Sequence, residues 1–121
     1  MNKDDIMNKK VNYSVSLWFA DLTNKDLDYF KNPIYGSIFD IFGGILDVYN
    51  FKDLDEGKKK FTELKNKYKY VKCYDGFYRF YCVSLDKCTL DDSSFMNIED
   101  IDYYEQNEDD LKKYQQIMTI Y

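Results

Sequence analysis

The fold is decided by the stretch Lys69-Tyr-Val-Lys-Cys-Tyr-Asp-Gly-Phe-Tyr-Arg-Phe-Tyr-Cys-Val-Ser-Leu85. Two runs rich in aromatic and β-branched residues flank Asp75-Gly76, and this dipeptide between such runs is a strong signal for a two-residue turn. The stretch therefore predicts a β-hairpin. Because side chains alternate along a strand, one hairpin face is expected to be core, and it carries Val71, Cys73, Tyr78, Phe80 and Cys82.

A further strand is predicted upstream, from Val11 to Phe19. Its odd-numbered residues are apolar, and its even-numbered residues are polar except for Trp18. Such period-two patterning is typical of a half-buried strand. We expect Trp18, on the more polar face, to be partly exposed or covered by a helix.

Four segments carry helical signals, and the first two follow this strand directly. Thr23 begins a short predicted helix, with Asp26 as the acidic member of a capping box. Asn32-Pro33 then marks the start of a second helix, in which apolar residues recur at helical spacing over residues 34–48. Gly43-Gly44 weakens this second helix near its end.

The other two helical segments lie on either side of the hairpin. Asp53 caps an amphipathic helix whose apolar stripe runs from Leu54 to Tyr68, with lysines over much of the remaining surface. Asn107 caps a last predicted helix that continues to Tyr121. Glu108, Asp109 and Asp110 would stabilise the positive N-terminal end of that helix.

These elements predict an α+β fold. We expect a small antiparallel sheet, made of the N-terminal strand and the 69–85 hairpin, packed against three to four helices. A length of 121 residues suggests a single domain. We place this domain at 11–121, behind a polar and flexible arm at 1–10.

The composition argues against an enzyme. The chain has no histidine, so the commonest general base is missing and a cysteine nucleophile lacks its usual imidazole partner. Gly43-Gly44 lacks the spacing of a phosphate-binding loop. We therefore predict no catalytic residue and no cofactor.

Metal binding is also disfavoured. The three cysteines match no zinc pattern. Adjacent carboxylates occur at Asp91-Asp92, Glu99-Asp100 and Asp109-Asp110, but no calcium-binding loop accompanies them.

The sequence predicts a cytoplasmic protein without a membrane segment. No apolar run approaches the roughly 20 residues of a membrane span, and the first residues do not resemble a secretory signal. An odd number of cysteines, Cys73, Cys82 and Cys88, indicates reduced thiols. The spacing of Cys82 and Cys88 is weak support for a disulfide.

Charge is distributed unevenly along the chain. The segment 51–72 has eight lysines and four acids, whereas the segment 86–110 has ten acids and one lysine. Carboxylates attract a basic partner from a distance and tyrosines supply buried anchors. We therefore predict a partner-binding surface formed by Asp91, Asp92, Glu99, Asp100, Asp102, Tyr103, Tyr104 and Glu105.

The acidic segment has a simpler interpretation without a binding role. It would then be a solvated loop that aids solubility. Against it, Phe95, Ile98 and Ile101 provide apolar anchors, so we expect a shaped element that is tied to the core. The stretch Ile98 to Tyr104 suits either a short strand or a helical turn.

The stretch Ser14-Val-Ser-Leu-Trp-Phe-Ala-Asp-Leu-Thr-Asn-Lys-Asp-Leu-Asp-Tyr-Phe30 resembles the opening of a bacterial immunity-protein family that neutralises polymorphic toxins. The resemblance lies in a Val-Ser-Leu-Trp strand followed by a short acidic helix, and it covers about one seventh of the chain. The apolar run over 34–48 departs from that pattern, and no functional residue is carried over. In size and charge the chain is also similar to phage anti-CRISPR proteins. Both resemblances imply a stoichiometric protein inhibitor.

The leading hypothesis is thus a small acidic inhibitor that blocks a nuclease or a related effector with a basic surface. One alternative is a homo-oligomeric assembly module that uses the apolar 34–49 segment, so a homodimer stays open. Another is a single-strand nucleic-acid binder, since aromatic rings with cations form stacking platforms. That hairpin face carries Tyr70, Lys72, Tyr74, Phe77, Arg79 and Tyr81. The net charge of −5 disfavours direct nucleic-acid binding.

Overall fold

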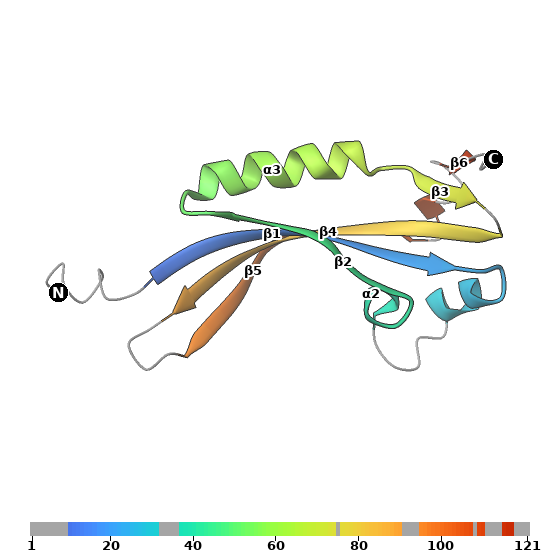
Figure 1. Cartoon of the computed structure of the whole chain (residues 1–121), viewed down its shortest axis with the longest axis horizontal. Helices are drawn as coiled ribbons and strands as arrows, with labels where there is room; N and C mark the ends of the chain where they lie inside the picture. The colour runs from blue at the N-terminus through green and yellow to red at the C-terminus, as the bar shows by residue number, and fades with distance from the viewer. Residues whose placement is uncertain are drawn as a thin grey trace, which may run out of the picture.

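The computed structural model describes residues 10–31, 37–74, 76–90, 95–107, 109–110 and 115–117. Its centre is a sheet in the order β2-β1-β4-β3-β6, and β5 also pairs with β4 (Figure 1). All pairings are antiparallel except that of β6 with β3. The strands are β1 (Lys10–Leu22), β2 (Gly43–Phe51), β3 (Val71–Tyr74), β4 (Phe77–Leu90), β5 (Met96–Glu105) and β6 (Gln115–Ile117).

The predicted N-terminal strand and hairpin are both confirmed. β1 pairs with β4 over its whole length, from Lys10 opposite Leu90 to Leu22 opposite Tyr78. β3 and β4 form the hairpin, and Gly76 at its turn has a φ of 81°. Glycine reaches this left-handed conformation without a steric penalty, which is why the Asp-Gly signal was informative.

One long helix, α3 (Leu54–Lys67), covers one face of the sheet (Figure 1). It is the predicted amphipathic helix, and the Asp53 carboxylate accepts a hydrogen bond of 3.1 Å from the Asp55 N–H at its start. Its buried residues join β1 and β4 in the first core, which consists of Val15, Leu17, Phe61, Leu64, Tyr81, Val83 and Leu85.

Among the described residues, the helices on the opposite face lie at one end, and they are the 3-10 helix η1 (Asp26–Phe30) and the short helix α2 (Ile38–Ile41) (Figure 1). The segment predicted as a helix capped by Thr23 forms only this five-residue 3-10 helix, and its N-cap is Lys25. Both the N–H and the hydroxyl of Thr23 donate to Asp26. The second core beneath these helices consists of Ala20, Leu22, Ile38, Phe39, Val71, Phe80 and Cys82.

The helix predicted over 34–48 is wrong. Within the described part of that segment only Ile38–Ile41 is helical, and Gly43–Phe51 is strand β2, which pairs with β1. At Gly43 an added Cβ would lie 1.8 Å from the Phe19 carbonyl oxygen. Strands β1 and β2 approach each other so closely at Gly43 that only glycine fits. The pairing with β1 thus overrides the helical spacing of the isoleucines in the sequence.

The helix predicted from Asn107 to Tyr121 is also wrong over Gln115–Ile117, which is strand β6. The Asn107 cap itself is present, because its side-chain oxygen accepts from the Asp109 N–H at 2.8 Å. Residues 111–114 and 118–121 lie outside the described residues, as does the arm except for Lys10, which begins β1.

The predicted fold class, a small sheet packed against three to four helices, is therefore wrong. Over the described residues the protein is mostly sheet, and its α-helices are α3 and the four-residue α2, beside the 3-10 helix η1. Within the acidic segment 86–110, Met96–Glu105 forms the ten-residue strand β5, which includes the Ile98 to Tyr104 part that suited a strand or a helical turn. Of its three expected anchors, Ile101 packs on the first core, whereas Phe95 and Ile98 are exposed.

Candidate protein-binding face

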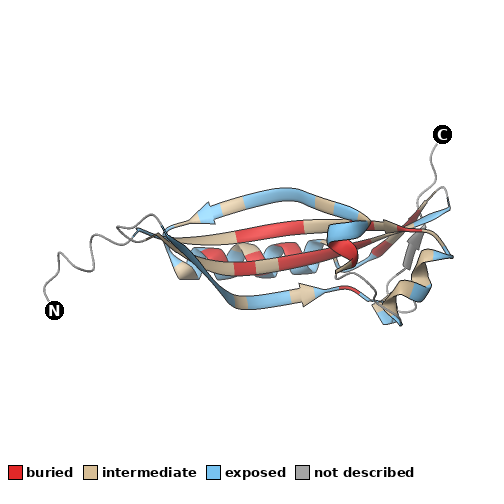
Figure 2. Ribbon diagram, turned by 90° about the horizontal axis from the view of Figure 1, so that it is seen from below, coloured by how far each residue is buried: buried red, intermediate tan, exposed pale blue. Residues whose placement is uncertain are grey.

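Away from α2 and η1, the sheet face opposite α3 has no described helix over it (Figure 2). Strand pairing arranges its residues in rows that run from β2 through β1 and β4 to β5. We call these residues the open face. The rows are Ile45-Trp18-Cys82-Glu105, Val48-Ser16-Ser84-Tyr103, Asn50-Ser14-Asp86-Asp100 and, without a β2 member, Asn12-Cys88-Ile98.

The open face has small side chains in the middle of its two central strands and apolar side chains on its outer strands. The central strands contribute Ser14, Ser16 and Ser84 there, with Trp18 at the α2 end and Asp86 beside Ser14. On the outer strands Ile45 is 52% exposed and Ile98 is 65% exposed. Exposed apolar side chains that gather on one face mark an interaction surface.

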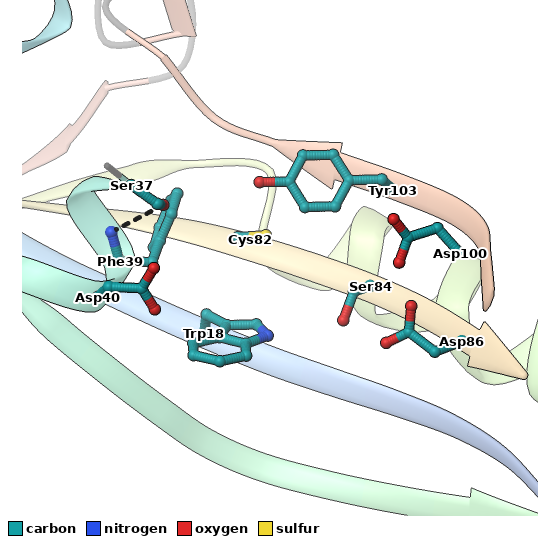
Figure 3. A pocket seen from close by; sticks show the side chains of 9 residues that line it. All are labelled: Trp18, Ser37, Phe39, Asp40, Cys82, Ser84, Asp86, Asp100 and Tyr103. Carbon is teal, nitrogen blue, oxygen red and sulfur yellow. Dashed lines mark hydrogen bonds between the residues drawn. The ribbon is translucent and has the colours of Figure 1, made fainter. Parts of the chain in front are cut away.

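A cavity of about 290 Å³ lies on the open face where it meets α2 (Figure 3). Aromatic rings and carboxylates dominate its wall, and none of the lining residues is a lysine or arginine. Carboxylates from three different elements, α2, β4 and β5, reach this one space. The lining residues are Trp18, Ser37, Phe39, Asp40, Cys82, Ser84, Asp86, Asp100 and Tyr103.

Asp86 and Asp100 are opposite each other in the β4–β5 ladder, and both line the cavity. Partial burial raises the pKa of Asp86 to about 6, and the neighbouring Asp100 carboxyl group acts in the same direction. Two neighbouring carboxylates cannot both ionise without repulsion. The pair therefore holds a proton below about pH 6 and gains a negative charge above it.

Tyr103 and Cys82 form the apolar side of the cavity. The Tyr103 hydroxyl donates to Glu105 at 2.6 Å, and burial raises the pKa of Tyr103 above its usual range. Burial also raises the pKa of the Cys82 thiol to about 12. Because the thiolate is the nucleophilic form, Cys82 is an inert neutral thiol at neutral pH.

The predicted partner-binding residues divide between the two faces of β5. Asp100, Tyr103 and Glu105 belong to the open face, as their pairing with Asp86, Ser84 and Cys82 shows. Glu99, Asp102 and Tyr104 lie on the other face of β5, toward α3.

On that α3 side, Tyr104 packs against the first core, with the Lys65 ammonium 5.4 Å from its ring centre. Glu99 is opposite Lys87, and Asp102 is opposite Leu85. Asp91 and Asp92 lie outside the described residues. Sequence reasoning missed Asp86, Asp40 and most of the β1 contribution, and the one available signal was Trp18 on the polar face of its strand.

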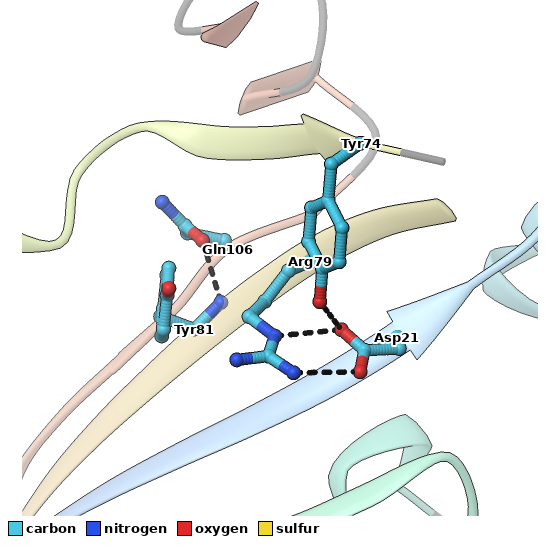
Figure 4. A network of polar contacts seen from close by, with 5 residues as sticks. All are labelled: Asp21, Tyr74, Arg79, Tyr81 and Gln106. Carbon is cyan, nitrogen blue, oxygen red and sulfur yellow. Dashed lines mark hydrogen bonds and ion pairs between the residues drawn. The ribbon is translucent and has the colours of Figure 1, made fainter. Parts of the chain in front are cut away.

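The tyrosine-rich hairpin face is already occupied by internal contacts (Figure 4). Arg79 donates two hydrogen bonds to Asp21, of 2.7 and 2.8 Å, and its guanidinium lies 4.6 Å from the centre of the Phe19 ring. The Tyr74 hydroxyl also donates to Asp21, and Tyr81 is buried in the first core. The arginine of the expected stacking platform is therefore paired inside the protein.

Gln106 closes the junction where β5 ends and β3 begins along the same edge of β4 (Figure 4). It is fully buried, and its side-chain oxygen accepts from the Tyr81 N–H at 2.6 Å. Its own N–H donates to the Tyr81 carbonyl, and its side-chain nitrogen donates to the Tyr68 carbonyl. The side chain thus joins β4 to the C-terminal end of α3, where Tyr68 is the C-cap residue.

Three further observations concern the described residues as a group. No cluster of three histidine, cysteine or acidic side chains among them has metal-binding geometry. No helix among them is long and apolar enough to cross a membrane. Cys73, Cys82 and Cys88 are free thiols, and Cys82 and Cys88 are about 20 Å apart because they are six positions apart along strand β4.

Searches of protein-family models, curated proteins and solved structures found no match to this chain. The resemblances to immunity and anti-CRISPR proteins therefore stay predictions, and function has to be argued from the open face.

Proposed function

We propose that the chain is a non-enzymatic inhibitor, in which the open face binds a basic surface on a nucleic-acid-processing protein. The observation that carries this proposal is the composition of that face. It holds three acids, Asp86, Asp100 and Glu105, and no cation, next to exposed apolar side chains. Acids give long-range attraction to a basic patch, and the exposed rings and aliphatic groups give contact area.

A protein partner suits this face better than nucleic acid. Phosphates would be repelled by the open-face carboxylates, because nucleic-acid affinity depends on neutralising phosphate charge. A protein surface that binds nucleic acid is itself basic, and it would match these carboxylates. The free thiols support a reducing, cytoplasmic compartment for such a complex.

Capture from a lysate of the source cells tests the proposal with two matched variants. Asp86→Asn/Asp100→Asn/Glu105→Gln neutralises the open face, whereas Glu63→Gln/Glu99→Gln/Asp102→Asn removes the same charge elsewhere. We expect the wild-type chain and the second variant to retain a basic protein that the first variant loses.

Mass spectrometry identifies the captured protein, and its activity on nucleic acid is then measured with the chain added. We expect inhibition that is complete near one equivalent of chain. Equal capture by both variants would contradict a role of the open face in binding. Unaltered activity of the captured protein on nucleic acid would contradict the inhibitor function.

A second candidate function is a homo-oligomer formed through β2. This strand pairs only with β1 among the described strands, and Ile45, Leu46 and Val48 on it are exposed. An exposed apolar edge strand is a template for pairing with another chain. Sedimentation over a wide concentration range distinguishes the two, since a strict monomer excludes this candidate.

A further inference from the structure

We infer that the open face is a docking groove for a single amphipathic helix of the partner, and that an arginine of that helix enters the cavity beside Asp86 and Asp100. This inference rests on the proposed function and deepens it, because it states which element of the partner is bound. It follows from the size of the face, the side chains at its centre and the charge of the cavity.

The size of the open face matches one helix. β2 and β5 are three strand spacings apart, which is about 14 Å, and a helix with its side chains is about 10–12 Å wide. The same two central strands are already covered on their other side by α3, a helix of 14 residues. The open face is therefore the second side of a sheet that holds one helix on its first side.

The side chains of the open face also favour a helix. The small residues Ser14, Ser16 and Ser84 at the centre leave room for a helix to approach the sheet. Ile45 and Val48 on β2 and Ile98 on β5 are exposed on either side of them, so they would contact the flanks of such a helix. Sheets in proteins bury an exposed face of this kind under helices or a further sheet.

The charge of the cavity indicates which side chain of the docked helix enters it. Asp40, Asp86 and Asp100 line it, and no lysine or arginine compensates them there. Trp18 and Tyr103 offer aromatic rings in the same space (Figure 3). A guanidinium bonds carboxylates through a planar fork and stacks on aromatic rings, which an ammonium does not do equally well. The occupant is thus an arginine.

The position of the cavity fixes where that arginine lies. It is at the α2 end of the open face, beside Phe39 and Ser37 of that segment. A second cavity of about 330 Å³ lies at the opposite end, and it has no carboxylate in its lining, which consists of Lys10, Asn12, Ser14, Asn50, Cys88, Leu90 and Met96. We therefore expect the arginine at the α2 end of the docked helix and an uncharged residue at the end beside Lys10.

A helix-constrained phage-displayed peptide library is the probe that tests this inference. The library is randomised on one face of a helix of about 16 residues and is selected against the full-length chain. We expect enrichment of peptides with an apolar face and one arginine near an end. A selection that yields no binders, or binders without arginine, would overturn the inference.

Binding of an enriched peptide is followed by fluorescence, because Trp18 is the only tryptophan of the chain. Replacing the peptide arginine by citrulline keeps its shape and removes its charge, and we expect binding to weaken about tenfold or more. Asp86→Asn/Asp100→Asn should cause a similar loss, and the control Glu99→Gln/Asp102→Asn should cause none. Equal binding of the citrulline peptide would contradict the arginine assignment.

The two proposals fail separately in these experiments. If selection yields no helical binder but capture of the cellular partner still needs Asp86 and Asp100, the helix inference falls and the proposed function stands. If helical peptides bind the open face but capture of the cellular partner is unchanged by the open-face substitutions, the proposed function is wrong. NMR amide shifts of the chain on peptide binding give a further check. Shifts confined to the edge of β2 would indicate that the peptide adds as a strand, and this result would also overturn the helix inference.

Discussion

Asp86 and Asp100 place two carboxyl groups opposite each other on neighbouring strands of a partly exposed sheet surface. Such a pair costs free energy in the isolated protein, since Asp86 gains its negative charge above about pH 6 while it lies opposite a second carboxyl group. Cross-strand neighbours of the same sign are destabilising. Repulsion between two surface carboxyl groups lowers the stability of the free protein. It is expected at a site where a cation of a partner binds between them.

The first prediction concerns the pH dependence of this cost. The pKa of Asp86 is raised from 3.8 to about 6 in the folded protein, so the folded state binds more protons between these values. Stability therefore falls as the pH rises through this window. We expect Asp100→Asn to raise the free energy of unfolding by about 1 kcal/mol at pH 7.5, a value reduced for solvent exposure, and to change it little at pH 4.

Urea unfolding at the two pH values measures this difference. Asp102→Asn is the control, because Asp102 is on the same strand but opposite Leu85. An equal gain in both variants would indicate a general effect of net charge, and no gain in Asp100→Asn at pH 7.5 would contradict the repulsion between the pair.

The second prediction concerns Gln106. Gln106→Leu keeps most of the buried volume but removes the acceptor for the Tyr81 N–H and the donor to the Tyr68 carbonyl. Leaving buried backbone groups unpaired should destabilise the protein by about 2–3 kcal/mol. Hydrogen exchange should show the Tyr81 amide losing protection first, and a Tyr81 amide that stays as protected as its β4 neighbours would contradict the bridging role.

At the scale of elements, the close pairing of β1 and β2 at Gly43 decides the third prediction. A Cβ at Gly43 would collide with the Phe19 carbonyl, whereas a Cβ at the adjacent Gly44 would meet nothing within 4 Å. We expect Gly43→Ala to destabilise the protein by about 2 kcal/mol or more and Gly44→Ala to be nearly neutral. Thermal unfolding of the two variants compares them, and equal effects would mean that β2 does not approach β1 in this way.

The same element shows why part of the fold could be predicted and part could not. The β1 strand, the 69–85 hairpin and α3 each have one clear periodicity, so local patterning was enough. The 34–48 segment is apolar at positions that suit both a helix and a strand, and the strand state of its part from Gly43 onward is fixed by pairing with distant β1. Strand β5 is rich in Asp and Glu, which are rare in strands, and it too depends on its neighbour β4.

The candidate site was predictable to the same extent. Asp100, Tyr103 and Glu105 were found because acids and tyrosines cluster in the sequence, although the alternation along β5 separates them from Tyr104. Asp86 and Trp18 were not found, because a cross-strand row depends on register between strands that are far apart in the chain. A one-residue change of register would move each of them to the opposite face.

At the scale of the whole molecule, the sheet separates two surfaces of different character. One face is closed by α3, whose exposed residues include Lys58, Lys59 and Lys65. The other is the open face, with its three acids. Chains that carry charge on one side orient an approaching partner before contact.

The last prediction follows from this separation and concerns the rate of association with the captured partner. If the open-face acids steer the encounter, the association rate should fall about tenfold or more between low salt and physiological salt, where the screening length is about 8 Å. Neutralising Asp86, Asp100 and Glu105 should lower the rate at low salt and flatten this dependence. Neutralising Glu63, Glu99 and Asp102 changes the net charge equally but leaves the open face intact, so its salt dependence should remain close to that of the wild type. Stopped-flow mixing at several ionic strengths measures both, and the same flattening in the two variants would mean that net charge alone, and not the open face, attracts the partner.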